Sequence, residues 1–310
     1  MNGRTAPAAA TIKVGMLISY DYAYARHSLP RLYEHADRIV LAVDRDSRSW
    51  TGEPYEIPDA FWNWIREIDV SGKIEVYRDD FHLPHLSTIE NDTRERNLLA
   101  RQMGEGGWHV QVDSDEYFAD FGAFARFLRR NSAWTRPGAP PLDIGVFWIP
   151  LYRQVDGGFL FMPDCFEPTV VATTCPDYKV ARKSNHPIRY VPASLFHQTW
   201  ARGEAEILRK LSSWGHSADF NIQHHFDAWK SASRVNYKAI RNFHPLIPTL
   251  WPRLEWCPGQ DVCEFIRNYR ERFPLGVPKR VYWRRRLGQL KKAWLDKLRQ
   301  RETGTFRQEP

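Results

Sequence analysis

Short apolar runs alternate with amphipathic segments through the first half of the chain. Four of the runs have the length of buried strands and end in polar residues, at 12–18, 38–43, 73–77 and 108–112. The segments between them carry helical periodicity or helix-start signals, at about 28–36, 61–65 and 93–103. Strands that alternate with helices at this spacing indicate an α/β fold, with a mainly parallel sheet flanked by helices. In such a sheet, ligands bind at the carboxyl ends of the strands.

The pattern is less regular in the second half. Strands are expected at 144–150 and 189–196, and Gly and Pro residues interrupt the region 156–185. With 310 residues, the chain can bury a large core without help from disulfides or metals. We predict a main domain over 1–250 and a C-terminal helical extension over 251–310.

The strongest chemical signal is an acidic cluster directly after the strand at 108–112. Asp113, Asp115 and Glu116 place three carboxylates within four residues, where they repel one another and are costly to desolvate. A hard divalent cation relieves that cost, because Mg²⁺ or Mn²⁺ takes oxygen ligands and completes its shell with substrate phosphates. A solvated acidic turn is the alternative, but the position at the end of a buried strand favours the metal site.

The same segment resembles a known motif. V-D-S-D-E-Y-F after a strand, with T-R-E-R-N-L-L-A-R upstream, is similar to the D-x-D region of GT-A glycosyltransferases, especially bacterial family-2-like enzymes that build surface glycans. The resemblance covers roughly residues 13–219. It implies a GT-A, Rossmann-like catalytic domain that moves a sugar from a nucleotide-diphosphate sugar to a hydroxyl of a surface glycan, lipopolysaccharide or other glycolipid. It also implies a Mn²⁺ or Mg²⁺ ion at Asp113 and Asp115, and a donor of the UDP or GDP class.

The resemblance further assigns the nucleotide contacts. In that family, the nucleotide lies beside the loop after the first strand, the end of the second strand and the helix before the D-x-D motif. The corresponding residues here, with those of the motif itself, are Ser19, Tyr20, Asp44, Arg96, Asn97, Arg101, Asp113 and Ser114. For the residues on the helix, an ordinary surface position is the alternative.

A histidine at the end of a later strand is the second anchor of the resemblance. GT-A enzymes often complete the metal site with a histidine placed like His197, which favours a role as metal ligand or phosphate contact; a structural histidine is the alternative. A helix expected over about 203–213 resembles the segment that closes over the pyrophosphate. There, Lys210 and His216 would neutralise charge as the sugar departs. A surface ion pair between Glu206 and Lys210 is the alternative.

Several carboxylates are candidates for the general base that the resemblance implies. An inverting transferase needs a group that removes the proton of the acceptor hydroxyl. Glu167 is favoured, Asp164 is the second choice, and Asp177 and Asp219 are further alternatives. Without a carboxylate in place, the enzyme would retain configuration. Three cations nearby would bind phosphate or an anionic acceptor, unless they form a solvated face: Lys179, Arg182 and Lys183.

Positive charge is concentrated near the C-terminus. The net charge is +7, but the segment 279–301 holds ten Lys or Arg residues and one acidic residue, whereas the rest holds 34 basic and 36 acidic residues. Apolar residues recur in this segment at helical steps: Trp283, Leu287, Leu290, Trp294 and Leu298. A basic amphipathic helix with tryptophans suits peripheral contact with an anionic membrane, and the acceptor would then be lipid-linked. Docking of the stripe on the main domain or on a second copy is the alternative.

Other functions and locations are less well supported. A protein that reads nucleic acid with its main body would carry a basic stripe there, whereas the positive charge here lies in the tail. A nucleic-acid-directed glycosyltransferase, or a binding protein that uses the basic tail, is therefore the second hypothesis. A hydrolase or nucleotidyltransferase with the same metal is the third. No apolar run approaches the roughly 20 residues that span a bilayer, and the polar start lacks a secretory signal. We therefore expect a cytoplasmic protein, associated with the inner face of the membrane through the basic helix. The four cysteines form no C-x-x-C pair, so reduced thiols are expected.

Overall fold

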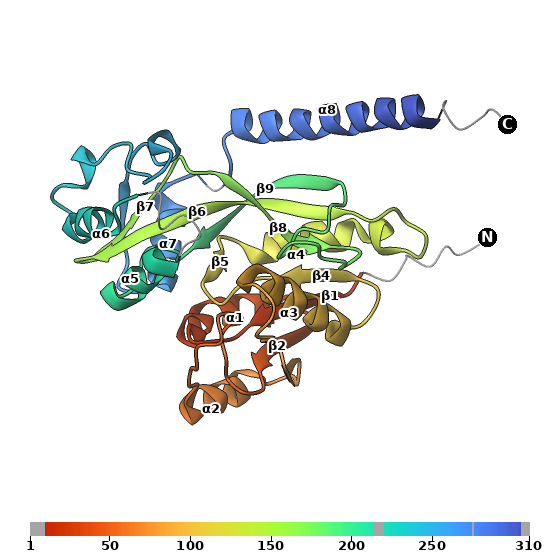
Figure 1. Ribbon diagram of the computed structural model, residues 1–310, viewed down its shortest axis with the longest axis horizontal. Coiled ribbons are helices and arrows are strands. Elements are labelled where there is room, and N and C mark those ends of the chain that lie inside the picture. The colour runs from red at the N-terminus through yellow and green to blue at the C-terminus, as the bar shows by residue number, and fades with distance from the viewer. Residues whose placement is uncertain (1–9, 214–219, 275, 305–310) are drawn as a thin grey trace.

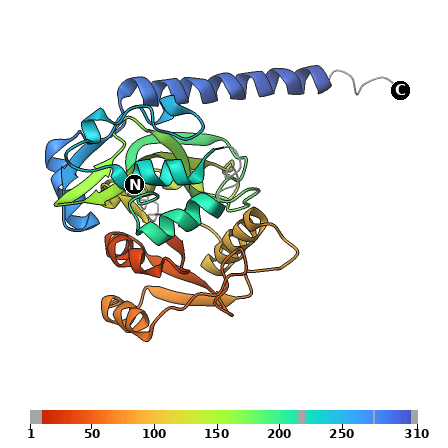
Figure 2. The ribbon, with the colours of Figure 1, turned by 60° about the vertical axis from the view of Figure 1, so that its left-hand side comes forward.

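The computed structural model describes residues 10–213, 220–274 and 276–304, and these form an α/β fold (Figures 1 and 2). The strands are β1 (Ile12–Leu17), β2 (Arg38–Asp44), β3 (Ile74–Asp79), β4 (Trp108–Gln111), β5 (Glu116–Phe118), β6 (Asp143–Val155), β7 (Gly158–Phe161), β8 (Glu167–Thr173), β9 (Ile188–His197) and β10 (Glu255–Pro258). The helices are α1 (Ala25–Tyr33), α2 (Asp59–Ile68), α3 (Thr88–Met103), α4 (Phe121–Arg130), α5 (Glu204–Ser213), α6 (Ile222–Ser231), α7 (Val262–Arg272) and α8 (Lys279–Gly304). The predicted α/β class is confirmed.

The strands form one sheet with a parallel half and a mixed half. Its order is β3-β2-β1-β4-β8-β6-β7-β10, and β9 pairs with β6 and β5. The four strands from β3 to β4 are parallel. Beyond β4, the pairs are antiparallel, except for the parallel pair of β6 and β9. The carboxyl ends of β1, β2 and β4 therefore meet at one edge, where ligands collect in sheets of this kind.

Helices cover both faces of the parallel half because the buried strands alternate their side chains. On β2, Val40 and Ala42 pack with Leu99 and Met103 of α3. The alternate residues of β2, Ile39, Leu41 and Val43, face a larger cluster that contains apolar side chains of α1, α2 and α4. Gly15 of β1 permits the close approach of α3, since a Cβ there would lie 2.8 Å from Leu99. The position of α3 matters for the acidic segment because this helix supplies Arg96, which pairs with Asp113.

Helix α3 begins five residues before the predicted start at Thr93. Ser87 and Glu90 form a capping box that satisfies backbone N–H groups at the true start. The acidic pattern at Asp92 to Glu95, which resembles a capping box, lies inside the helix instead. The helix ends at Gly104, where φ is 77°. The capping box at Ser87 and Glu90, not the similar pattern five residues later, therefore sets the start of the helix.

The predicted domain border at residue 250 is wrong, because the chain beyond it completes the same core. Strand β10 pairs with β7 at the end of the sheet. Helix α7 packs Phe265 and Tyr269 against aromatic side chains of β7 and β9. On the other face, α5 and α6 join a cluster around Trp200 and Trp229. Residues 251–274 are therefore part of the main body.

The predicted helix near the C-terminus is confirmed as α8. Figures 1 and 2 show it running above β9 and projecting beyond the body at its C-terminal end. It contacts β9, and Val281 and Arg284 in its first turns line a hollow with Tyr190 of that strand. None of the described helices is long and apolar enough to cross a membrane.

Candidate functional site

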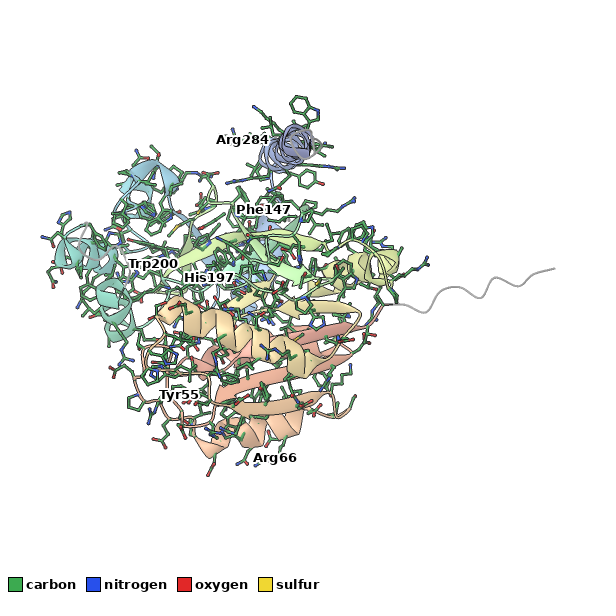
Figure 3. All side chains as sticks on the ribbon, turned by 45° about the vertical axis from the view of Figure 1, so that its right-hand side comes forward. Tyr55, Arg66, Phe147, His197, Trp200 and Arg284 are labelled. Atoms are coloured by element: carbon green, nitrogen blue, oxygen red, sulfur yellow. The ribbon has the colours of Figure 1, made fainter. Side chains whose placement is uncertain are left out.

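The structure brings Asp115 and His197 together at the carboxyl edge of the sheet. The turn after β4 carries Asp115, and β5 follows it at once. Glu116 of β5 lies opposite His197 of β9 in the antiparallel pair, and the Gln198 N–H donates to the Asp115 carbonyl over 2.9 Å. As a result, Asp115 Oδ2 lies 3.4 Å from His197 Nε2. Figure 3 shows His197 and Trp200 in the same region of the molecule.

Arg202 is the central cation of this site, and the sequence analysis assigned it no role. Its guanidinium donates to Asp115 Oδ2 over 2.5 Å and lies 3.5 Å from Asp21 Oδ2 and 3.4 Å from Glu206 Oε1. The same group stacks over the Tyr24 ring at 4.7 Å. The side chain is only 8% exposed. Arg202 therefore links the loop after β1, the acidic turn and the start of α5.

The charges of the site are strongly coupled. Burial alone would raise the pKa of Asp115, but the positive charges of His197 and Arg202 outweigh burial and hold that pKa well below its ordinary value. Burial and the nearby Asp115 charge raise the pKa of Asp21. Of these two carboxylates beside Arg202, only Asp115 is strongly stabilised as an anion.

Lys210 reaches the site from the predicted helix α5. Its Nζ donates to Thr199 Oγ1 over 3.3 Å, and this hydroxyl lies 2.7 Å from His197 Nε2. Burial, with a smaller contribution from Arg202, lowers the pKa of Lys210 to about 8. Glu206, its ion-pair partner in the alternative interpretation, contacts Arg202 and the Tyr24 hydroxyl. His216 lies outside the described residues.

Asp113 belongs to a neighbouring ion pair. Arg96 of α3 donates to both of its carboxylate oxygens, over 3.0 and 3.2 Å, and Arg182 lies 3.9 Å away. Burial opposes ionisation, but these two cations lower the pKa of Asp113. Arg96 also donates to Asp92 over 2.6 Å. Asp113 and Asp115 are thus held by different cations.

Glu116 has a structural role, so the three acidic residues do not act alike. It is fully buried and accepts two hydrogen bonds from Arg182, at 2.6 and 2.7 Å, and one from Trp148 at 2.8 Å. It also accepts the Asp113 N–H over 3.0 Å. The Trp148 ring packs on His197 at 4.7 Å between centroids. This network fixes the acidic turn, and it accounts for Arg182, which was predicted to face a phosphate or acceptor.

The predicted nucleotide contacts near β1 and β2 differ in exposure. Tyr20 is half-exposed, and Ser19 donates to Asp21 over 3.1 Å. Asp44 is buried and accepts four backbone N–H groups, two in its own loop and two at Phe81 and His82. The structure assigns the Asp44 oxygens to loop organisation. Direct nucleotide contact by Asp44 stays a prediction.

Two other predicted nucleotide contacts, Asn97 and Ser114, are hydrogen-bonded within the protein or buried. Asn97 donates to the Tyr178 carbonyl over 2.9 Å and accepts the Tyr178 N–H over 3.0 Å. It therefore ties α3 to the loop after β8. Ser114 is buried, whereas Arg101 is exposed on the last turn of α3. Nucleotide binding by these residues stays a prediction.

The candidate bases lie on the mixed half of the sheet. Glu167 is exposed at the start of β8, directly opposite Trp148 of β6. Because cross-strand neighbours share a face of the sheet, Glu167 lies on the face of Trp148, whose ring covers His197. Asp164 is paired instead with Arg253 over 2.7 Å at the surface. Of the further alternatives, Asp177 pairs with Lys179, and Asp219 lies outside the described residues.

The donors fit an open metal site better than a closed one. Asp115 and His197 supply one oxygen and one nitrogen within reach of each other. Asp113 does not join them: among the described residues, a trio of ligand atoms all within 4.8 Å of one another occurs only at His27, Asp261 and Cys263. Mg²⁺ is commonly held by one or two protein groups plus substrate phosphates. Asp115 and His197 are compatible with that arrangement.

Comparisons with known proteins leave the family open. No family model matches the sequence, and no curated protein matches it. Among solved structures, a fragment of S. aureus TarS (residues 1–349) matches 44% of this chain and 36% of its own at 16% identity and a TM-score of 0.30. The longer S. aureus TarS structure matches 74% of this chain and 45% of its own at 14% identity and a TM-score of 0.33. The chain thus spans less than half the length of either structure, and scores this low establish no common family.

Proposed function

We propose that this protein is a metal-dependent glycosyltransferase of the GT-A type, using a nucleotide-diphosphate sugar donor. One observation carries the proposal: Asp115 lies at the carboxyl edge of a parallel half-sheet, with its Oδ2 atom shared between His197 and Arg202. A carboxylate, an imidazole and a buried guanidinium at one point form a site for a metal and a diphosphate. The order of the parallel strands supports ligand binding at this edge.

Each side chain has a distinct role in the proposal. Asp115 and His197 would hold Mn²⁺ or Mg²⁺, and the ion supplies positive charge to the diphosphate leaving group. Arg202 and Lys210 are placed to bind the same phosphates. Arg96 keeps Asp113 oriented beside the site, where the motif resemblance assigns it to the donor. Glu167 is the proposed base, since its exposed carboxylate shares the face of Trp148.

Ligand-dependent melting tests the proposal. We expect one class of nucleotide-diphosphate sugar, UDP- or GDP-linked, to raise the melting temperature by several degrees when Mn²⁺ is present. Saturation at 100 times Kd stabilises the folded state by about 2.7 kcal/mol. The matching nucleoside monophosphate and samples with EDTA are the controls. An equal rise in melting temperature without metal would contradict the proposed metal dependence. If no donor raised the melting temperature, the transferase assignment would be overturned.

The proposal extends to a membrane-bound acceptor, and α8 supports this part. Its large apolar residues are exposed: Trp283, Leu287, Leu290, Trp294 and Leu295. Residues of α8 that line a hollow with Tyr190 of β9 include Val281, Arg284, Arg285 and Gly288. Successive helix residues are about 100° apart, so the stripe 283/287/290/294 points away from the body. Docking of this stripe on the main body is therefore contradicted. The side chain of Leu298 is not described.

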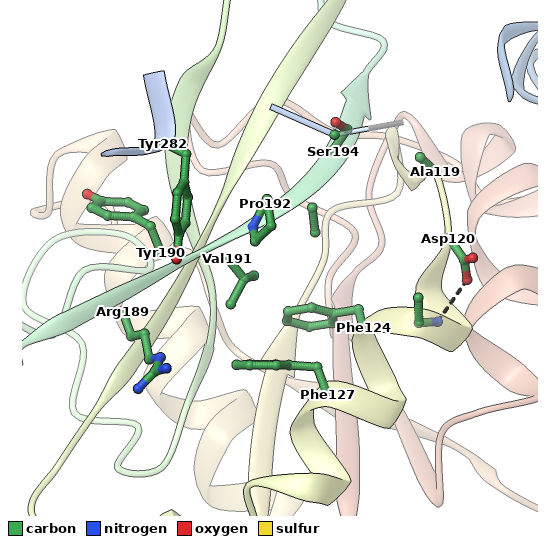
Figure 4. Close-up of a pocket in the computed structure, with 13 residues that line it drawn as sticks. Ala119, Asp120, Phe124, Phe127, Arg189, Tyr190, Val191, Pro192, Ser194 and Tyr282 are labelled. Carbon is green, nitrogen blue, oxygen red and sulfur yellow. Dashed lines mark hydrogen bonds between the residues drawn. The ribbon is translucent and has the colours of Figure 1, made fainter. Parts of the chain in front are cut away.

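An apolar cavity lies where α8 meets the body. It has a volume of about 340 Å³ and lies between Phe124 and Phe127 of α4, Val191 and Pro192 of β9, and Tyr282 of α8. Figure 4 shows the two phenylalanine rings facing the strand, with Tyr282 beside Tyr190. The first turns of α8 therefore lie beside an apolar cavity, while Lys291, Trp294 and Leu295 further along are exposed and available to a bilayer.

Vesicle co-sedimentation tests the membrane contact. We expect the protein to bind vesicles that contain anionic phosphatidylglycerol, and binding to weaken as salt rises, because exposed charges are screened. Trp283→Ser should reduce binding about tenfold, since it removes a large part of the apolar face. Val235→Ser is the matched control, because Val235 is 95% exposed but lies off α8. Equal binding of both variants, or dimer formation through the stripe in solution, would overturn this assignment.

A further inference from the structure

A cluster of potential metal ligands lies outside the site described above. His27 belongs to α1, whereas Asp261 and Cys263 lie at the start of α7. One ligand atom from each residue lies within 4.8 Å of the other two. Cys263 Sγ and His27 Nδ1 are 3.5 Å apart, although 236 positions separate the two residues in the chain. The fold therefore brings a thiol, an imidazole and a carboxylate to one point.

The start of α7 makes the two ligands on it available. Asp261 is the N-cap, and its Oδ1 accepts the Glu264 N–H over 2.8 Å, which leaves Oδ2 for another partner. Cys263 lies in the first turn, where the helix N-terminus favours a thiolate. Asp261 is exposed, and His27 and Cys263 are partly exposed. An ion can thus reach the cluster from solvent.

From this geometry we infer that His27, Asp261 and Cys263 form a binding site for Zn²⁺. Sulfur and imidazole donors select a borderline-soft ion over Mg²⁺ or Ca²⁺. Three protein ligands leave a fourth position for water. Binding replaces the thiol proton of Cys263, which passes to solvent, and no oxidation is involved. The site uses none of the residues of the proposed transferase site, so it goes beyond that function.

The charge around the cluster is compatible with a thiolate. The hydrogen bond between Cys263 and His27 lowers the pKa of the thiol and raises the pKa of the imidazole, against the effect of burial on both groups, and the nearby cation Arg31 lowers the pKa of Cys263 further. Arg31 repels a bare divalent ion. The thiolate and the Asp261 carboxylate together carry two negative charges that balance Zn²⁺.

The inferred ion would connect distant parts of the chain. Helix α1 follows the loop that holds Asp21 and Tyr24 beside Arg202. Helix α7 packs into the aromatic cluster of β7 and β9. A metal between α1 and α7 would therefore stabilise the folded chain and limit movement of the loop after β1.

Cobalt titration of the full-length reduced protein tests the site, because Co²⁺ bound to a thiolate gives a charge-transfer absorption band. We expect one Co²⁺ per chain with this band, its displacement by Zn²⁺, and a rise in melting temperature with Zn²⁺. Cys263→Ser should abolish the band, and His27→Gln and Asp261→Asn should weaken binding at least tenfold. Asp261→Asn keeps a good N-cap residue, so it separates the loss of a ligand from the loss of the helix start.

The controls keep this test apart from the transferase assignment. Cys175→Ser removes another partly exposed free thiol and should leave the band unchanged. His197→Ala should also leave it unchanged, whatever it does to donor binding. A band that persists in Cys263→Ser, or no thiolate band in the wild type, would overturn the inference.

Discussion

Asp115→Asn is expected to lower the rate of sugar transfer by about 10²–10³-fold, the range seen when one preorganised group that stabilises transition-state charge is removed. The substitution keeps the shape of the side chain but removes the negative charge that holds His197 and Arg202 together. In the proposed reaction it also removes the anionic ligand of the metal. The measurement is steady-state release of nucleoside diphosphate with the donor found by the melting screen, at saturating Mn²⁺.

Asp115→Asn could lose activity through its chemistry or through its folding, and the two causes are separable. Arg202 keeps two other acidic neighbours, Asp21 and Glu206, when Asp115 becomes neutral. We therefore expect Asp115→Asn to fold, with a moderately lower melting temperature and no Mn²⁺-dependent donor shift. Asp59→Asn, a charge loss at the exposed start of α2, is the matched control and should keep full activity. Normal turnover by Asp115→Asn would contradict the assigned role.

Arg182→Met is expected to lower the free energy of unfolding by about 3–5 kcal/mol, the cost of breaking a buried ion pair. Methionine fills a similar volume but leaves the fully buried Glu116 carboxylate without its cation. Trp148 and the Asp113 N–H still donate to Glu116, and they do not replace a charge. The effect is measured by urea denaturation.

Arg253→Met is the matched comparison for this stability effect. Arg253 forms an ion pair with Asp164 at 2.7 Å, but both side chains are about 40% exposed. Exposed ion pairs contribute about 1 kcal/mol or less, so the free energy of unfolding of this variant in urea should be close to that of the wild type. Similar losses of unfolding free energy in Arg182→Met and Arg253→Met would show that Arg182 does not stabilise the protein through a buried ion pair.

The sequence predicts the centre of the site because strand ends can be recognised from apolar runs. The run before Asp113 and the run before His197 each stop at a polar residue, and the pairing of β5 with β9 brings Asp115 and His197 together. The same reasoning predicts the parallel half of the sheet and α8. In each case the information is local, since a periodicity or a buried run defines the element.

Contacts between distant residues explain what the sequence analysis missed. No sequence pattern marks Arg202, and Arg182 was a candidate for binding a phosphate or an acceptor; only the folded chain places these two cations within 2.7 Å of Asp115 and Glu116. Asn97 likewise meets Tyr178 across 81 positions. The start of α3 was misplaced because two acidic patterns compete within a few residues. The border at 250 was misplaced because a short edge strand such as β10 has no distinctive pattern.

The position of β10 determines where the chain can be shortened safely. A protein that ends at residue 250 would leave β7 as an open edge and expose the aromatic rings that α7 covers. An uncovered edge strand pairs readily with other chains, so such a fragment is expected to aggregate. A fragment that ends at Pro278, before α8, keeps β10 and α7 in place. The main body and the basic helix are therefore separable only beyond α7.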